Sequence, residues 1–288
     1  MDSCKPFDAL LTPPFHTSGA PEGSFWPWAD TPTWGKVAML EAFIDAPLRH
    51  EKLTVFPVIA PHGPVLPYLL STEIQDSGVL TIREKGDSDP PALLVRNNSL
   101  HPLLILAGEP LPGENPGRLV QRSILLGGKT VTQVPASPVE RGGWIASDRE
   151  SEVTEWMGGF TIRKNQVGFL AFHGCKMLGL EALGSANLYG PLHRRLLIRF
   201  VKQALDASPE EDGDSSALER KAGEILDGIG NAERLPGKRI GVGEYCTLAG
   251  PVSGGDLTHQ GHLVHLSVES SSVTGGSEQW WEGEVQCS

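Results

Sequence analysis

Short apolar segments separated by turn-forming residues recur between residues 52 and 145, and this pattern constrains the fold more strongly than any other feature of the sequence. The alternating segment V-L-T-I-R-E at 79–84 is typical of a half-buried strand. The runs A-L-L-V-R-N at 92–97 and P-L-L-I-L-A at 102–107 are bounded by Asn, Ser, Pro and Gly, which favours buried strands. Together these segments predict one antiparallel β unit over residues 52–145.

Two details of strand pairing follow from the residues of this unit. The segment K-L-T-V-F-P-V-I at 52–59 contains Pro57, which has no backbone N–H to donate, so we expect an edge strand there. The segments at 119–126 and 130–134 flank the sequence G-G-K. A short glycine-containing connection of this kind indicates a hairpin turn between two paired strands.

Helical periodicity replaces the strand pattern at residues 190–205, where the sequence is G-P-L-H-R-R-L-L-I-R-F-V-K-Q-A-L. Its apolar residues recur every three to four positions, which predicts an amphipathic helix. Arg195, Arg199 and Lys202 lie on the polar side of this helix. A solvent-exposed face is the first interpretation of such a basic stripe, and a patch for an anion or an acidic partner is the second.

A second amphipathic helix is expected over residues 216–229. Ser216 and Glu219 have the spacing of a capping box, in which each side chain bonds a backbone N–H of the first turn. Strand-like sequence returns at 239–250 and 262–268. The predicted fold is therefore α+β, a largely antiparallel β-sheet or sandwich with two inserted amphipathic helices.

The chain divides into three predicted parts. Residues 1–50 form an irregular Pro/Trp-rich N-terminal arm, because the density of proline excludes a long helix or a central strand. Its aromatic residues predict packing onto the body of the protein or the docking of a protein partner. Residues 51–269 form a single α+β domain, and the Ser/Gly-rich residues 270–288 form a mobile tail.

Charge and hydropathy exclude several classes of partner. The net charge of −11 argues against a nucleic-acid binder, which needs basic surface to replace counterions. No apolar run reaches the roughly 18–20 residues of a membrane-spanning helix, and the first residues lack the order of a signal peptide. The four cysteines are scattered, which favours reduced thiols. We expect a cytoplasmic protein without a membrane partner.

Metal and cofactor motifs are not found. His259, His262 and His265 are spaced by three, but a strand turns His262 away from the other two, and a helix separates the outer pair by about 240°. The glycine-rich segments match neither the dinucleotide-binding fingerprint nor the phosphate-binding loop of nucleoside triphosphatases. We therefore predict no metal and no cofactor.

Two stretches place acidic and basic residues at predicted strand ends. G-E-P-L-P-G-E-N-P-G-R at 108–118 carries Glu109, Gly113 and Arg118, and Arg122 follows soon after. The other stretch is S-P-V-E-R-G-G-W, with Glu140 and Trp144. An arginine offers a planar fork of donors suited to phosphate or carboxylate, and a glutamate beside it could orient it or act as a base. The alternative is a structural ion-pair network of Glu109, Arg118 and Glu140.

These two stretches resemble the ARG and rhodanese–phosphatase-superfamily-associated protein domain family. The resemblance rests on N-N-S at 97–99, G-E-P-L-P-G followed by Arg118, L-V-Q-R-S-I-L-L, and P-A-S-P-V-E-R-G-G-W at 135–144. The strongest agreement covers residues 52–145. The chain departs from the family pattern at Pro116, where the family has glutamine, at Pro138, where it has cysteine, and at Gly143, where it has arginine.

The resemblance implies a role related to NAD and ADP-ribose metabolism, through the gene and domain associations of the family. The first hypothesis is a domain that recognises a small anionic ligand, phosphorylated or related to ADP-ribose and NAD, through Arg118 and Arg122, with Glu109, Glu140, Gly113 and Trp144 completing the site. The second is a hydrolase or transferase acting on such a ligand, with Glu140 or Glu109 as the catalytic candidate. The third is a structural or partner-binding protein without a small-molecule site.

Overall fold

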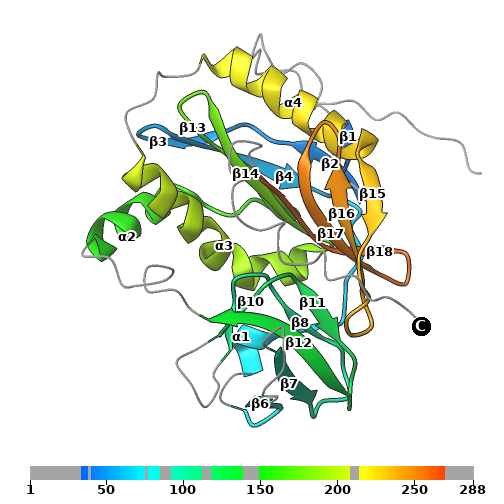
Figure 1. Cartoon of the computed structure of the whole chain (residues 1–288). Helices are drawn as coiled ribbons and strands as arrows, with labels where there is room; N and C mark the ends of the chain where they lie inside the picture. Colours follow the sequence, from blue (N-terminus) through cyan, green and yellow to red (C-terminus); the bar gives the residue numbers. More distant parts are fainter. Residues whose placement is uncertain are drawn as a thin grey trace, which may run out of the picture. The chain divides into compact units, whose positions relative to one another are not determined.

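The computed structural model describes residues 34–37, 40–74, 77–84, 92–111, 118–138, 149–207 and 214–269. All of them belong to one compact unit, Pro32–Ser288. Their architecture is α+β, with largely antiparallel sheets and four helices in this part of the chain (Figure 1). The predicted fold class is confirmed.

The largest sheet has ten strands in the order β1-β2-β4-β13-β14-β18-β17-β16-β15, with β3 paired to β4, and every pairing is antiparallel. Its strands are β1 (Trp34–Val37), β2 (Leu40–Ile44), β3 (Leu48–His50), β4 (Leu53–Ile59), β13 (Gln166–His173), β14 (Lys176–Leu183), β15 (Glu233–Pro236), β16 (Glu244–Ala249), β17 (Ser253–His259) and β18 (His262–Glu269). The hairpin β13–β14 is the centre of this sheet. Side chains at alternate positions face its two sides.

Two smaller sheets carry the motifs that the sequence singled out. One has the order β6-β7-β12-β10-β9 and the other the order β11-β8-β5. Their strands are β5 (Leu69–Leu70), β6 (Leu80–Glu84), β7 (Ala92–Asn97), β8 (Leu103–Ile105), β9 (Pro110–Leu111), β10 (Arg118–Val120), β11 (Ile124–Leu126) and β12 (Val131–Pro138). A separate apolar core lies among these strands and is built mainly of Leu, Ile and Val.

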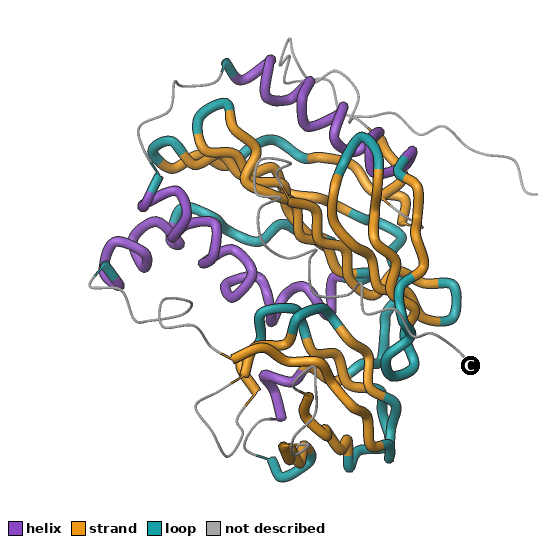
Figure 2. Tube along the Cα trace, viewed as in Figure 1, coloured by secondary structure: helices purple, strands orange, loops and turns teal. Residues whose placement is uncertain are grey.

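The two long helices cover opposite faces of the ten-stranded sheet (Figure 2). The helices are α1 (Ser71–Ile74), α2 (Glu150–Gly158), α3 (Ala186–Asp206) and α4 (Ser215–Asn231). Both predicted amphipathic helices are present, as α3 and α4. The cap of α4 is Asp214, whose carboxylate accepts a hydrogen bond from the Ala217 N–H at 3.2 Å, so the capping box predicted from Ser216 is not the cap that forms.

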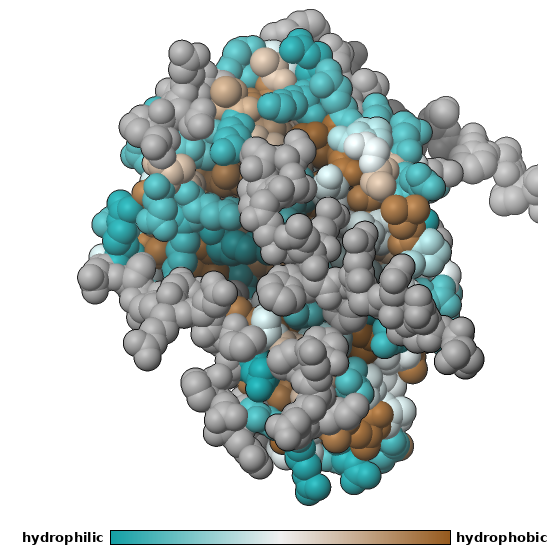
Figure 3. Space-filling view, in the orientation of Figure 1, coloured by the Kyte–Doolittle hydropathy of each residue, from teal (hydrophilic) through white to brown (hydrophobic). Residues whose placement is uncertain are grey.

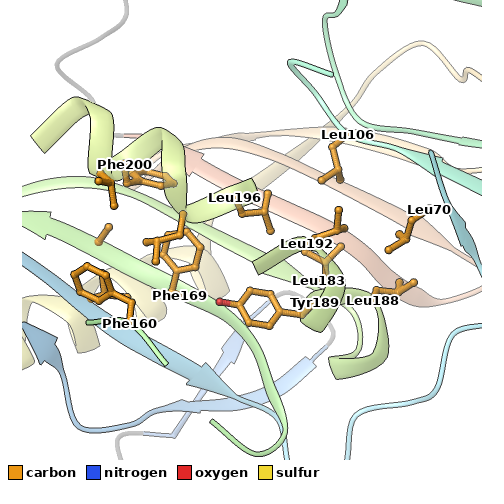
Figure 4. Packing of buried hydrophobic residues seen from close by; sticks show 14 of the residues in the cluster. Leu70, Leu106, Phe160, Phe169, Leu183, Leu188, Tyr189, Leu192, Leu196 and Phe200 are labelled. Carbon is orange, nitrogen blue, oxygen red and sulfur yellow. The ribbon is translucent and has the colours of Figure 1, made fainter. Parts of the chain in front are cut away.

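Helix α3 is held against the sheet by a row of apolar residues one turn apart. Leu188, Leu192, Leu196 and Phe200 point toward the strands that carry Phe169 and Leu183 (Figure 4). The Phe169 and Phe200 rings meet edge to face at 5.3 Å between centroids. Full burial of one such side chain contributes about 1.5–3 kcal/mol, so this row fixes the position of α3 over the sheet.

The prediction of one β unit over residues 52–145 was wrong. Strand β4 pairs with β13 on one side and with β2 and β3 on the other, so it is an interior strand of the large sheet. The Pro57 carbonyl accepts a hydrogen bond from the Asp45 N–H at 2.9 Å, on the side of β4 that faces β2 and β3. The nitrogen and the carbonyl of a strand residue point to the same side, so the missing N–H of Pro57 faces the interval where the pairing changes from β3 to β2. Proline is tolerated there because a donor is lost at an interruption of the ladder.

The predicted hairpin at G-G-K was also wrong. The segment 119–126 is divided between β10, which pairs with β12, and β11, which pairs with β8 in the other small sheet. Lys129 adopts a positive φ of 56°, and the Thr130 hydroxyl donates to the Gly127 carbonyl at 2.8 Å. The turn therefore exists, but it carries the chain from one sheet to another.

The face of the molecule in Figure 3 shows hydrophilic residues with smaller hydrophobic patches among them. Within the residues that the structure describes, no helix combines the length and the apolar composition that crossing a bilayer requires.

Candidate functional site

Glu109, the glutamate of the G-E-P-L-P-G motif, lies in a tight turn between β8 and β9. Gly108 has a φ of +73°, which glycine adopts readily and a side chain disfavours. The turn is held against β10, because Gly108 N–H donates to the Val120 carbonyl at 2.7 Å and Val120 N–H donates to the Glu109 carbonyl at 3.0 Å. The Glu109 residue is only 3% exposed. The turn thus places a carboxylate in the interior.

Two partners from distant parts of the sequence bind the Glu109 carboxylate. Arg195 of α3 approaches Oε1 with its Nη1 at 3.0 Å, and the Ser71 hydroxyl at the start of α1 donates to Oε2 in a short hydrogen bond. Burial raises the pKa of Glu109 above its ordinary value, and Arg195 and Ser71 hold back part of that rise. A carboxyl group with a raised pKa keeps its proton to higher pH than an exposed glutamate does, and buried carboxyls of this kind are often found at functional sites.

A second buried carboxylate, Glu181 of β14, lies under the same helix. Its Oε1 accepts from the Arg199 guanidinium in a short contact and from the Ser267 hydroxyl at 2.8 Å, and its Oε2 is 2.7 Å from His265 Nε2. Burial alone would raise the pKa of Glu181, but Arg199 and the hydrogen bonds from His265 and Ser267 outweigh it and lower that pKa. Glu181 is therefore held in its ionised form.

His265 connects this carboxylate to the small β sheets. The Ser123 hydroxyl, just before β11, is 2.9 Å from His265 Nδ1, and Ala107 N–H donates to Ser123 Oγ at 3.0 Å. An ionised carboxylate only accepts hydrogen bonds, so His265 Nε2 must carry the proton that it shares with Glu181. In the neutral ring, Nδ1 then accepts from the Ser123 hydroxyl.

These groups form one buried charged cluster, and the name is used below for the following residues. It consists of Ser71, Glu109, Ser123, Glu181, Arg195, Arg199, His265 and Ser267. Its two carboxylates are balanced by two guanidinium groups, and the positive charge of His265 would favour the ionised form of Glu109. The two carboxylates have pKa values displaced in opposite directions, a pattern typical of an acid and a base in one site.

The arginines of the predicted site have other partners. Arg118 of β10 places its Nε 3.6 Å from Oε1 of Glu84 in β6. Arg122 donates to the Lys238 carbonyl at 2.6 Å, and its guanidinium lies 5.2 Å from the centroid of the Tyr245 ring. Neither arginine is the one that pairs with Glu109. The structure thus does not form the predicted ion pair between Glu109 and Arg118.

The remaining predicted site residues lie outside the described residues. These are Gly113, Glu140 and Trp144, together with Pro116 and Gly143 among the departures from the family pattern. Pro138 lies at the end of β12, where its Cα is opposite that of Arg118. The binding roles of Gly113, Glu140 and Trp144 stay predictions.

Sequence reasoning missed most of the charged cluster. Arg195 and Arg199 were noticed as a stripe but assigned first to solvent, whereas their side chains are 22% and 39% exposed and both bind buried carboxylates. Glu181 was missed, although a glutamate within the apolar run L-G-L-E-A-L is a signal of a partnered buried charge. Ser123 was part of the quoted motif L-V-Q-R-S-I-L-L without being given a role.

The three histidines are used separately. His265 belongs to the charged cluster, whereas His259 Nδ1 is 2.9 Å from the Tyr68 hydroxyl. His262 is opposite His259 at the start of β18. Among the described residues, no group of three or more His, Cys, Asp or Glu side chains is arranged to hold a metal ion.

Comparison with known proteins gives a family and no nearer relative. No curated protein and no solved structure matches the chain. The model of the ARG and Rhodanese-Phosphatase-superfamily-associated Protein domain matches residues 41–152 and 145–269, which include every member of the charged cluster. The chain therefore belongs to the ARG and Rhodanese-Phosphatase-superfamily-associated Protein domain family.

Proposed function

We propose that this domain recognises a small anionic ligand, phosphorylated or related to ADP-ribose and NAD, at the charged cluster. The observation that carries the proposal is the placement of Arg195 and Arg199. They are one turn apart on α3, and each guanidinium is oriented by a buried carboxylate while its side chain stays partly exposed. Guanidinium groups held in this way are suited to phosphate and carboxylate groups.

The carboxylates do more than balance charge in this proposal. Glu109 and Glu181 anchor the two arginines from below, so little side-chain freedom is lost when a ligand binds. The ligand class also draws on membership of the family, whose gene and domain associations imply a role related to NAD and ADP-ribose metabolism.

A thermal-shift titration with ADP-ribose, NAD and inorganic phosphate tests the proposal. A ligand that binds only the folded state raises the free energy of unfolding, by about 2.7 kcal/mol at a concentration of a hundred times Kd, and so raises the melting temperature. We expect the rise with ADP-ribose in the native chain, and its loss in Arg199→Gln. Arg194→Gln is the matched control, because Arg194 is an exposed residue of the same helix. An equal rise in both variants would refute the assignment of the site.

The role predicted for Arg118 is tested in the same titration. If Arg118→Ala removes the rise with ADP-ribose while Arg199→Gln keeps it, the ligand site lies on the small β sheets instead of the charged cluster. A flat response of the native chain to all three compounds would favour the structural or partner-binding hypothesis.

A hydrolase or transferase acting on such a ligand is the second candidate function. The opposite displacement of the Glu109 and Glu181 pKa values favours it, because a buried carboxyl with a raised pKa can serve as a general acid or base. We expect a Glu109→Gln variant to bind ADP-ribose and to lose any turnover of ADP-ribose or NAD, measured by chromatography of the products. Turnover equal to that of the native chain would remove Glu109 from the mechanism.

A further inference from the structure

We infer that Ser123 is a nucleophile for acyl transfer, with His265 as its base and Glu181 as the group that orients the imidazole. Ligand recognition by the arginines neither requires nor supplies this chemistry. The inference rests on the hydrogen bonds that connect the three side chains, and it can fail or succeed independently of the proposed anion site.

The three residues come from separate elements that the fold brings together. Glu181 is opposite Ser267 in the β14–β18 pairing, and His265 is opposite Leu183, so the carboxylate and the imidazole are diagonal neighbours on one face of the sheet. Ser123 is supplied by the segment between β10 and β11 of the small sheets. Its Oγ is 2.9 Å from His265 Nδ1, and His265 Nε2 is 2.7 Å from Glu181 Oε2.

This order of contacts is that of a nucleophile, a base and an orienting acid. The Ser123 oxygen already accepts the Ala107 N–H at 3.0 Å, so its own proton is directed to His265. Two further donors, Arg199 and Ser267, fix the Glu181 carboxylate. The ionised carboxylate next to Nε2 stabilises the imidazolium that forms when Ser123 gives up its proton.

The reaction is balanced for a carboxylic ester. Ser123 Oγ bonds to the carbonyl carbon while its proton passes to His265 Nδ1, and the ester C–O bond then breaks as the leaving alkoxide takes that proton. Water next attacks the acyl carbon and gives one proton to His265. The bond between the acyl carbon and Ser123 Oγ then breaks, Oγ recovers the proton from His265, and the carboxylic acid is released. No oxidant, reductant or metal is required.

Covalent labelling of the full chain tests the inference. The native protein is treated with diisopropyl fluorophosphate, a small reagent chosen because Ser123 is 3% exposed, and the adduct is located by peptide mass spectrometry. We expect one adduct at Ser123, absent from Ser123→Ala and reduced at least about tenfold in rate in His265→Gln. Ser216→Ala is the control, because Ser216 is an exposed serine of α4, outside the charged cluster, and its loss should leave the labelling of Ser123 unchanged.

The contrary results are equally specific. An unlabelled Ser123 in folded native protein, under conditions that fully label a serine esterase, would overturn the inference and leave the network a structural role. Labelling at Ser123 that is unchanged by His265→Gln would show that the imidazole does not activate the hydroxyl. The folded state of each variant is checked by circular dichroism, and the native labelling result stands without any variant.

Discussion

Separating Glu109 from Arg195 should cost the domain several kilocalories of stability. Arg195→Leu leaves a carboxylate that is 3% exposed without its guanidinium partner. Loss of one partner of a buried pair typically costs about 3–5 kcal/mol. We expect the lower limit, about 3 kcal/mol, because the Ser71 hydrogen bond remains and the carboxyl, whose pKa is already raised, can protonate.

The double variant Glu109→Leu/Arg195→Leu distinguishes the pair from its parts. Removing both charges leaves no uncompensated carboxylate, so its loss should be at least about 2 kcal/mol smaller than the sum of the two single losses. In melting temperature, a loss of about 3 kcal/mol corresponds to about 6–12 °C for a domain of this size.

Urea unfolding of the native chain, Glu109→Leu, Arg195→Leu and the double variant measures this coupling. Arg194→Leu is the control, because Arg194 is an exposed arginine on the same helix. The control should change stability by less than about 0.5 kcal/mol. Additive losses in the double variant, or an Arg195→Leu chain as stable as the control, would show that the two charges are not coupled and would refute the electrostatic reasoning.

Three further predictions concern the surroundings of the same cluster. The lowered pKa of Glu181 stabilises the folded state at pH values above the ordinary value of 4.5, and this stability is lost as the pH falls through the pKa of the folded state. The melting temperature of Glu181→Gln should therefore fall less in acid than that of the native chain. Glu109 contributes to the pH dependence with the opposite sign, because its raised pKa makes protonation favour the folded state. The melting temperature of Glu109→Gln should therefore fall more steeply in acid than that of the native chain. Gly184→Ala should cost about 3 kcal/mol in urea unfolding, since its Cβ would lie 1.7 Å from the Leu263 carbonyl oxygen, whereas Gly158→Ala, with nothing within 4 Å, should be tolerated.

Local sequence patterns predicted the types of element well and their partners poorly. The amphipathic periods of α3 and α4 depend on which residues share a helix face, and that is set within the segment itself. Strand pairing is set elsewhere. Strand β4 was expected at an edge because of Pro57, but it is central because it pairs with β13, more than a hundred residues later. The β13–β14 hairpin was not predicted from the sequence. No local signal divides 119–126 between two sheets.

The candidate site shows the same limit. Glu109 was predicted from its motif, and the structure places it in a buried turn. Its cation was expected nearby in sequence, at Arg118, but Arg195 supplies it from α3. A basic stripe on a helix has the same pattern whether it faces water or buried carboxylates, and only the packing of α3 on the sheet decides between them. The contact of His265 with Glu181 depends on the register of β14 and β18, which the sequence does not specify.

Calorimetric titration of ADP-ribose into the native chain, Arg199→Gln and Arg194→Gln tests the central claim most directly. The claim is that the charged cluster under α3 recognises an anionic ligand. The account predicts saturable binding in the native chain and in Arg194→Gln, with affinity reduced at least about tenfold, or 1.4 kcal/mol, in Arg199→Gln. Binding that is the same in all three proteins, or absent from the folded native chain, would contradict it.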